Sequence, residues 1–188
     1  DTSISNVMEP LGMNATGVIG EGIAASQISP GNWVGSLTSL TGGKGYWMIL
    51  STSITFSYDI STLSRSDHYL PTGLSFPDTY NIYQSTRQAF YLIKNIFIED
   101  EPISNEDWVL MYHNEKIIGA RKWNGNYTDI PAMGYDGSIK TAGYMEVGST
   151  PTFKMLNSEG LLVDLYVDGS IENWTNNGVD VITLTTEA

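Results

Sequence analysis

The chain has 188 residues, of which 41% are hydrophobic and 11% aromatic, enough to bury a core in one or two small domains. The formal net charge of -12 argues against nucleic acid and anionic membranes as partners, because both require clustered Lys and Arg. The absence of cysteine excludes disulfides and thiolate metal sites, and no apolar run reaches the length of a membrane span, so we expect no membrane insertion.

The first 60 residues predict one short helix followed by several strands. Asn6 and Glu9 have the spacing of a capping box, which indicates a helix that Pro10 then ends. Short strand-like runs with turn signals between them cover 16–19, 33–37, 45–50 and 53–58. Residues 61–78 are rich in polar side chains and contain two prolines, so we expect a linker or a long crossover there.

Residues 79–188 predict a second β-rich unit. A hairpin is indicated by two strand-like runs, 108–112 and 117–123, on either side of the turn 113–116. Glycine-containing turns separate the other predicted strands, which cover 80–83, 88–98, 143–146, 151–156, 161–167 and 179–186. Together these patterns predict an all-β fold, mainly antiparallel and sandwich-like, with one short N-terminal helix and with units over 1–60 and 79–188.

The stretch around Lys44 resembles a phosphate-binding loop without meeting its requirements. Thr38 stands where such a loop needs its first glycine, and Gly45 follows the lysine without supplying a hydroxyl for magnesium. An aromatic and aliphatic run follows, which favours a strand over a helix start. We therefore interpret 33–48 as a hairpin with its turn at 41–43.

From the sequence we expect that the protein is not an enzyme. The stretch GEGIAA at 20–25 has the pattern of a dinucleotide-binding turn, but Pro30 ends any helix behind it within about two turns. His68 and His113 are the only histidines, and they come without cysteine or the H-E-x-x-H pattern of a catalytic zinc site. We expect no organic cofactor, and only a metal ion remains as a candidate.

Carboxylates form the richest pattern of candidate ligands. Asp164, Asp168 and Glu172 recur every four residues, and Asp136 stands in a predicted loop. Oxygen ligands on loops are typical of calcium sites, so these four residues are the candidate calcium ligands. Turn statistics favour the other interpretation, that Asp136-Gly137 and Asp168-Gly169 are ordinary hairpin turns, and the EF-hand pattern is absent.

The aromatic residues indicate a second kind of site. Eleven Tyr and five Trp are enough to form a platform on which sugars stack. Burial is nevertheless the favoured interpretation, because most of the tryptophans lie within predicted strands: Trp33, Trp47, Trp108 and Trp123.

Two sets of motifs connect the chain with known β-modules. The first set is GEGIAA at 20–25, WVGSL at 33–37 and GKGYW at 43–47, and the second is QAFY at 88–91, DWV at 107–109, GARKW at 119–123 and TFK at 152–154. In these motifs the chain resembles β-modules of secreted and surface proteins of marine bacteria and of structural proteins of marine phages. The resemblance implies an extracellular, cell-surface or virion location, and it brings no catalytic residues.

The resemblance also implies an incomplete sheet. Relatives of the first module begin with a strand before the helix, whereas this chain begins at Asp1, as expected of a processed or trimmed chain. A sheet that lacks a strand exposes N–H and C=O groups that a neighbouring copy can pair. We expect the strand-like run 178–186 to be the donor, and the alternative is that this run pairs within its own chain. Its candidate assembly residues are Val179, Val181, Ile182 and Leu184.

These inferences lead to two alternative functions. The first is a non-enzymatic structural subunit of an extracellular or virion assembly, such as a fibre, tube or appendage, that joins copies of itself or other surface proteins by strand addition. Head-to-tail addition produces an open polymer. The low charge of the first 60 residues, where Lys44 is the only base, suits such close packing. The alternative is a glycan-binding or adhesion module, which is favoured if exposed aromatic side chains lie beside carboxylates.

Overall fold

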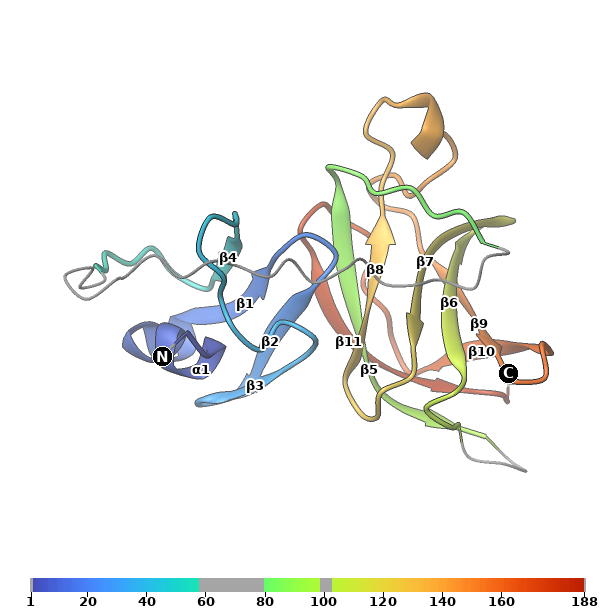
Figure 1. Cartoon of the computed structure of the whole chain (residues 1–188), viewed down its shortest axis with the longest axis horizontal. Helices are drawn as coiled ribbons and strands as arrows, with labels where there is room; N and C mark the ends of the chain where they lie inside the picture. Colours follow the sequence, from blue (N-terminus) through green and yellow to red (C-terminus); the bar gives the residue numbers. More distant parts are fainter. Residues whose placement is uncertain (1, 58–79, 99–102, 188) are drawn as a thin grey trace. The chain divides into compact units, whose positions relative to one another are not determined.

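The computed structural model describes residues 2–57, 80–98 and 103–187, and the chain divides into two compact units, Asp1–Ser75 and Phe76–Ala188 (Figure 1). Strands dominate both units, and most neighbouring strands are antiparallel. The expectation of an all-β, mainly antiparallel fold with one short N-terminal helix is confirmed. The predicted linker over 61–78 lies outside the described residues.

The first unit packs a short helix against a small open sheet. The helix α1 (Ile4–Met8) begins before the predicted cap Asn6 and continues into the 3-10 helix η1 (Glu9–Asn14). The strands are β1 (Ala15–Ile19), β2 (Ala24–Ser29), β3 (Asn32–Val34) and β4 (Trp47–Leu50), in the antiparallel order β3-β2-β1-β4. The helix and one face of the sheet share a core, whose buried members are Ile4, Met8, Leu11, Ala15, Val18, Ala25 and Leu37.

The stretch 33–48 is not the hairpin that the sequence predicts. β3 pairs with β2 and β4 pairs with β1, so the two strands lie at opposite edges of the sheet. The cause lies at Gly35, whose φ is +113° and where a Cβ would lie 2.3 Å from the carbonyl oxygen of Ala24. The chain therefore turns across β2 after Val34, and the Leu37 N–H donates to the Ala24 carbonyl at 2.9 Å.

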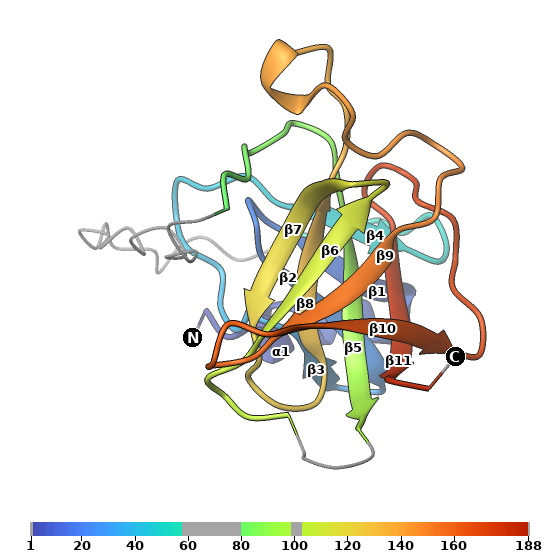
Figure 2. The same ribbon diagram turned by 90° about the vertical axis from the view of Figure 1, so that its right-hand side faces the viewer.

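The second unit is built from one seven-stranded sheet (Figure 2). The strands are β5 (Gln88–Phe97), β6 (Trp108–His113), β7 (Lys116–Lys122), β8 (Thr128–Met133), β9 (Thr152–Leu156), β10 (Leu162–Asp168) and β11 (Val179–Thr185). Their order is β7-β6-β9-β10-β11-β5-β8, and every neighbouring pair is antiparallel except β5 and β11, which run parallel. The short 3-10 helix η2 (Ile139–Thr141) lies in the connection between β8 and β9.

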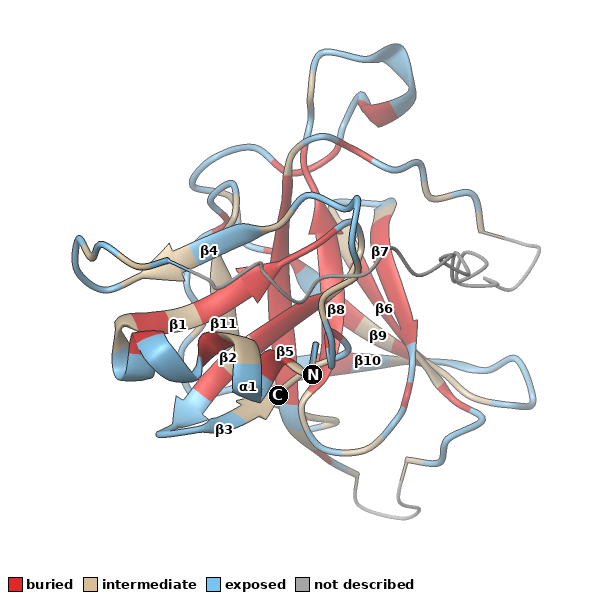
Figure 3. Cartoon of the chain, turned by 60° about the vertical axis from the view of Figure 1, so that its left-hand side comes forward, coloured by how far each residue is buried: buried red, intermediate tan, exposed pale blue. Residues whose placement is uncertain are grey.

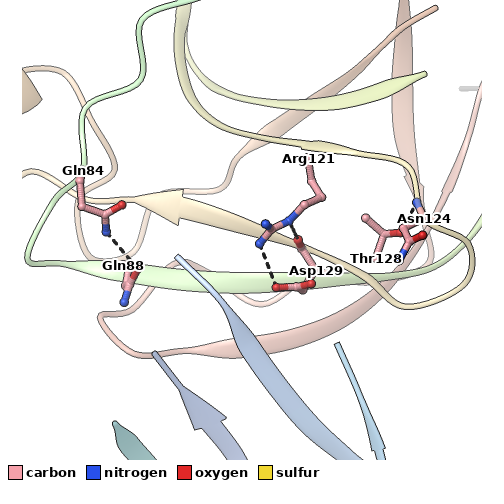
Figure 4. Close-up of polar contacts among 6 residues, drawn as sticks. All are labelled: Gln84, Gln88, Arg121, Asn124, Thr128 and Asp129. Atoms are coloured by element: carbon pink, nitrogen blue, oxygen red, sulfur yellow. Dashed lines mark hydrogen bonds and ion pairs between the residues drawn. The ribbon is translucent and has the colours of Figure 1, made fainter. Parts of the chain in front are cut away.

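The sheet of the second unit curls until its edge strands, β7 and β8, lie against each other. A Cβ on Gly119 of β7 would lie 1.8 Å from the carbonyl oxygen of Pro131 in β8, so only glycine allows this approach. Next to it, Arg121 donates through Nε to the Asp129 carbonyl at 2.7 Å and through Nη2 to the Asp129 carboxylate at 3.1 Å (Figure 4). Both side chains are buried, so a buried ion pair fastens the two edges together.

The concave face of this sheet encloses the core of the second unit. Trp174, from the loop between β10 and β11, is fully buried, and its indole N–H donates to the Ala132 carbonyl at 3.0 Å. Gly134 makes room for the ring, because a Cβ there would lie 2.4 Å from it. All seven strands supply buried core residues, among them Tyr91, Met111, Ile118, Ile130, Phe153, Leu165 and Ile182.

Several sequence predictions about single strands need correction. The hairpin over 108–123 is confirmed, with the tighter turn Asn114-Glu115, where Asn114 has a φ of 55°. The strand predictions over 53–58, 80–83 and 143–146 are wrong for the residues that the structure describes there. The sequence does not predict β2 or β8. β2 is rich in Ala and Ser, and β8 contains a proline, which sheets disfavour.

The closed seam between β7 and β8 makes Gly119→Ala destabilising. We expect this substitution to lower the free energy of unfolding by roughly 1–3 kcal/mol, because a methyl group cannot fit without moving the backbone of β8. Gly45→Ala is the control, since nothing lies within 4 Å of a Cβ at Gly45. Urea denaturation followed by circular dichroism measures both. Equal stability of the two variants would contradict a seam closed at this point.

Candidate functional site

The outer face of β10, β11 and β5 carries a cross-strand row with two exposed aromatic side chains. The register sets Tyr166 of β10 opposite Thr185 of β11, and Thr185 opposite Phe97 of β5. Directly opposed residues point to the same face of a sheet, and their chain neighbours point to the other. This face is the outer one, because the neighbours Leu165 and Leu184 belong to the core. We name Tyr166, Thr185 and Phe97 the aromatic row.

A row of polar side chains lies beside the aromatic row, two residues away along each strand. Asp168 of β10 opposes Thr183 of β11, and Thr183 opposes Asn95 of β5. We name these three residues the polar row. A carboxylate, a hydroxyl and an amide stand side by side, so the polar row offers both donors and acceptors of hydrogen bonds.

Both rows depend on an irregularity in the pairing of β5 with β11. Ile182 opposes Ile93, but the next residue, Thr183, opposes Asn95, so Lys94 is an extra residue on β5. A shift of one residue reverses the faces of a strand. Without the extra residue, Phe97 would therefore point to the opposite face.

The two aromatic side chains are open to solvent. Tyr166 is 44% and Phe97 is 54% exposed. A shallow pocket of about 170 Å³ lies beside Phe97 and is also lined by Thr185, Thr186 and Glu187. Two hydrogen bonds hold its walls: the Thr186 N–H donates to the Phe97 carbonyl at 3.1 Å, and the Glu187 N–H donates to the Thr185 hydroxyl at 3.2 Å.

Carboxylates dominate the charge of this face. Asp164 and Asp168 flank Tyr166 along β10, and Glu187 lines the pocket beside Phe97. The ammonium of Lys154 in β9 donates a hydrogen bond to the Asp164 carboxylate, and this hydrogen bond raises the pKa of Lys154. The positive charge of Lys154 is therefore paired with Asp164. A face with carboxylates and hydroxyls repels anions and suits neutral or cationic ligands.

The carboxylate of Asp136, one of the four calcium candidates, is occupied by donors of its own chain. It lies in the loop after β8 and accepts from the Thr141 hydroxyl at 2.6 Å, the Ser138 N–H at 3.0 Å and the Thr86 N–H at 3.2 Å. The Thr141 hydroxyl makes the largest contribution, and together these donors lower the pKa of Asp136 to about 2. The carboxylate therefore ties its loop to the segment before β5.

The other three calcium candidates do not come together: Asp164 and Asp168 lie on either side of Tyr166 along β10, and Glu172 lies in a loop. Asp164 is bound to Lys154, Asp168 belongs to the polar row, and Glu172 lies in the loop before β11. Within the described parts of the chain, no three His, Asp or Glu side chains gather closely enough to hold a metal ion. The four residues thus form no common site in this structure, and calcium binding stays a prediction.

The expected donor strand is paired on both sides within its own chain, which is the alternative that the sequence left open. β11 lies between β10 and β5. Ile182 and Leu184 are buried in the core, whereas Val181 is 39% exposed and Val179 lines a pocket of about 210 Å³. Donation to another copy would break two ladders and expose two core residues, so β11 is not a free strand.

The pocket at the start of β11 has polar walls that satisfy one another. The Tyr91 hydroxyl donates to the Glu172 carbonyl at 3.1 Å, and the Glu172 N–H donates to the Asp180 carboxylate at 2.8 Å. Burial, followed by the nearby Asp180 and Glu172 carboxylates, raises the pKa of Tyr91, so its hydroxyl stays protonated and keeps donating. This pocket is therefore a weaker candidate for a ligand than the outer face.

The histidines supply no catalytic pair in the described contacts. His113 lies at the end of β6, and its Nδ1 is 3.1 Å from the carbonyl oxygen of Gly143. This partner is a backbone group, which orients the ring at the hairpin. His68 lies outside the described residues.

Sequence reasoning names only one residue of the two rows, Asp168, and assigns it to calcium. The sequence could have predicted Tyr166, because apolar and exposed positions alternate along β10 and this alternation places Tyr166 on the outer face. The same alternation misplaces Phe97, because Lys94 interrupts the period of β5. Trp47 is also 53% exposed, although its predicted strand favours burial.

No protein-family model, curated protein or solved structure matches the chain. In the part of the chain that the structure describes, no helix combines the length and the apolar character needed to cross a membrane. Inference about function therefore depends on the geometry and chemistry of the aromatic and polar rows.

The low pKa of Asp136 makes part of the stability pH-dependent. Because its folded-state pKa of about 2 lies below the ordinary value of 3.8, the charge of Asp136 stabilises the fold fully above the ordinary value, and this stabilisation is lost as the pH falls through about 2. Asp136→Asn should therefore melt below the wild type at about pH 6, and the difference should shrink between about pH 4 and pH 2. Melting followed by circular dichroism measures this difference.

Thr141→Val is the matched test of the cause. It removes the hydroxyl that contributes most to the low pKa, so the pKa of Asp136 measured by NMR should rise toward its ordinary value. An unchanged pKa in this variant would contradict the assignment.

Proposed function

We propose that the chain is a carbohydrate-binding module, and that the aromatic row and the polar row form its binding face. The observation that carries the proposal is the aromatic row, in which exposed Tyr166 and Phe97 stand on either side of Thr185 across neighbouring strands. Aromatic side chains offer a large contact area and lose little conformational freedom on binding. A rigid sheet holds them in place before the ligand arrives, which favours binding.

The chemistry of the two rows suits a sugar. One face of a pyranose ring carries mainly C–H groups, which pack on an aromatic ring, while the ring edge carries hydroxyl groups. Asp168, Thr183 and Asn95 stand two residues further along the same strands and supply partners for these hydroxyls. An apolar floor with a few placed polar groups is typical of small-molecule sites.

Strand spacing and charge narrow the ligand class. Tyr166 and Phe97 lie two strand spacings apart, which is about 10 Å, so a disaccharide or a longer glycan reaches both rings. Asp168 and Glu187 disfavour sulfated or uronic acid-rich glycans, whereas the charge of Asp164 is paired with Lys154. The ligand is therefore a neutral oligosaccharide, held on an open face.

Titration of the protein with a panel of neutral oligosaccharides, for example cellotriose, maltotriose, xylotriose and chitotriose, tests the proposal by NMR and calorimetry. Tyr166→Ala and Phe97→Ala should each weaken binding by roughly 10-fold, because loss of about 1.4 kcal/mol of stacking is a tenfold change in affinity. Tyr135→Ala is the matched control, since Tyr135 is a 38% exposed aromatic residue in the loop after β8.

Two outcomes would contradict carbohydrate binding at the two rows. One is the absence of any chemical-shift change with the whole panel. The other is an equal loss of binding in Tyr135→Ala, which would place the ligand elsewhere on the second unit.

A second candidate function is supported by a different observation, the edge strand β4, which pairs on one side only among the described residues of the first unit. In this alternative the chain is a non-catalytic structural subunit of an extracellular, cell-surface or virion assembly, such as a fibre, tube or appendage. It associates with copies of itself or with other surface proteins by strand addition. The edge strand supports this alternative because its backbone can extend the sheet into a neighbour.

Electron microscopy of the purified protein at several concentrations, with calcium and with a chelator, tests the structural alternative. If this alternative holds, ordered fibres or tubes form, and their loss in chelator would add calcium to the assembly. Uniform small particles under every condition would count against a polymer.

A further inference from the structure

Within the described residues, the edge strand β4 lacks the features that protect the other sheet edges. In the second unit the edges meet each other, and Pro131 interrupts β8. The opposite edge of the first sheet, β3, is only three residues long. β4 consists of Trp47, Met48, Ile49 and Leu50, without charge, proline or glycine, and its ribbon is exposed or half-buried throughout (Figure 3). Such a strand is a template for pairing.

Hydrogen bonds show which backbone groups of β4 point away from β1. The Ile49 carbonyl accepts from the Thr16 hydroxyl of β1 at 3.3 Å, and the Ser51 N–H donates to the last residue of η1 at 2.9 Å. In an antiparallel pair, the N–H and C=O of one residue point to the same neighbour, and successive residues alternate. Ile49 and Ser51 therefore face β1, whereas Met48 and Leu50 present their N–H and C=O groups at the edge.

We propose that a second copy of the chain pairs with this edge, antiparallel and about a two-fold axis perpendicular to the sheet. The register that satisfies every outward group sets Met48 opposite Leu50 of the other copy, and Ile49 opposite its own counterpart. Met48 and Leu50 then exchange two hydrogen bonds on each side of the axis. The sheets of the two first units become one continuous sheet, and the contact closes as a dimer.

The side chains that meet in this register are apolar. The two Ile49 side chains oppose each other on one face, and each has the Trp47 of the other copy as its diagonal neighbour. Met48 and Leu50 oppose each other on the face that carries the core. Trp47 and Met48 are 53% and 37% exposed, so pairing covers the apolar surface that the single chain leaves in water.

The distribution of charge favours a second copy at this edge. The first 60 residues contain Lys44 as the only base and Asp1, Glu9, Glu21 and Asp59 as the only acids, so most of the net charge of -12 lies in the rest of the chain. Two copies therefore repel each other least when they approach through their first units. A strongly charged partner would find no complementary charge on β4.

This dimer uses the same edge strand as the structural alternative, but its two-fold contact closes at two copies and gives no open polymer. It also differs from the donation of β11 and from carbohydrate binding. No strand has to leave its sheet for the dimer to form. β11 takes no part in the contact between the copies. The dimer is independent of the proposed sugar face, because β4 and the two rows lie in different units.

Cysteine substitutions test the register, because the chain contains no cysteine of its own. Opposed Cα atoms in a non-hydrogen-bonded pair lie about 4.5 Å apart, a distance that a disulfide bridges. Ile49→Cys should therefore give a disulfide-linked dimer under mild oxidation. Met48→Cys is the matched control, because the two Met48 Cα atoms lie about 8 Å apart in this register, too far for a disulfide.

Met48→Pro tests the hydrogen bonds of the pairing. The N–H that it removes points to the open edge, so β4 keeps its ladder with β1. The dissociation constant of the dimer, measured by analytical ultracentrifugation, should rise by roughly 10-fold or more, because two hydrogen bonds are lost per dimer. Circular dichroism and oligosaccharide titration of the same variant verify that both units remain folded.

The expected result is a concentration-dependent dimer that Ile49→Cys crosslinks, that Met48→Cys does not crosslink and that Met48→Pro weakens. A wild-type chain that stays monomeric at every concentration would overturn the proposal. A dimer that both cysteine variants crosslink equally, or that Met48→Pro leaves unchanged, would overturn it as well, because the copies would then meet elsewhere.

Discussion

The pairing of β11 between β10 and β5 is the interaction on which the second unit depends. Without β11 the sheet would fall into two parts, β7-β6-β9-β10 and β5-β8. With it, the sheet is wide enough to curl until β7 meets β8, where Gly119 and the Arg121–Asp129 pair close the seam. Ile182 and Leu184 bring the same strand into the core. The C-terminal run is therefore a central part of its own sheet, held by ladders on both sides.

The same strand also shapes the outer face. β11 sets Thr185 between Tyr166 and Phe97, and the extra residue Lys94 of β5 determines that Phe97 points outward. The aromatic row thus results from three strands that are distant in sequence. The two units differ in what they offer to partners, since the closed second unit offers faces of side chains and the first unit offers a backbone edge. Carbohydrate binding and dimerisation use these two kinds of surface separately.

Local patterns in the sequence predict most of the strands and only a small part of the candidate site. β10 and β11 are readable from their alternation, and β5 from its long apolar run, since both are properties of short segments. β8 is not, because Pro131 is acceptable only at an edge, and edge position is a property of the whole sheet. Asp168 is readable as a candidate ligand, but its neighbours on the outer face belong to other strands. The calcium grouping fails to form because Asp136 and Asp164 find donors elsewhere in the chain.

The sequence by itself determined an all-β chain with a short N-terminal helix, an acidic second part and a nearly uncharged first part, because composition and periodicity act locally. The tertiary structure alone decided the partner of each strand: β3 and β4 at opposite edges, β11 inside its own sheet, and Tyr166 in line with Phe97. Strand order follows from the packing of residues far apart in the chain. A bulge of one residue reverses the face of every position after it, and no local pattern records where that bulge falls.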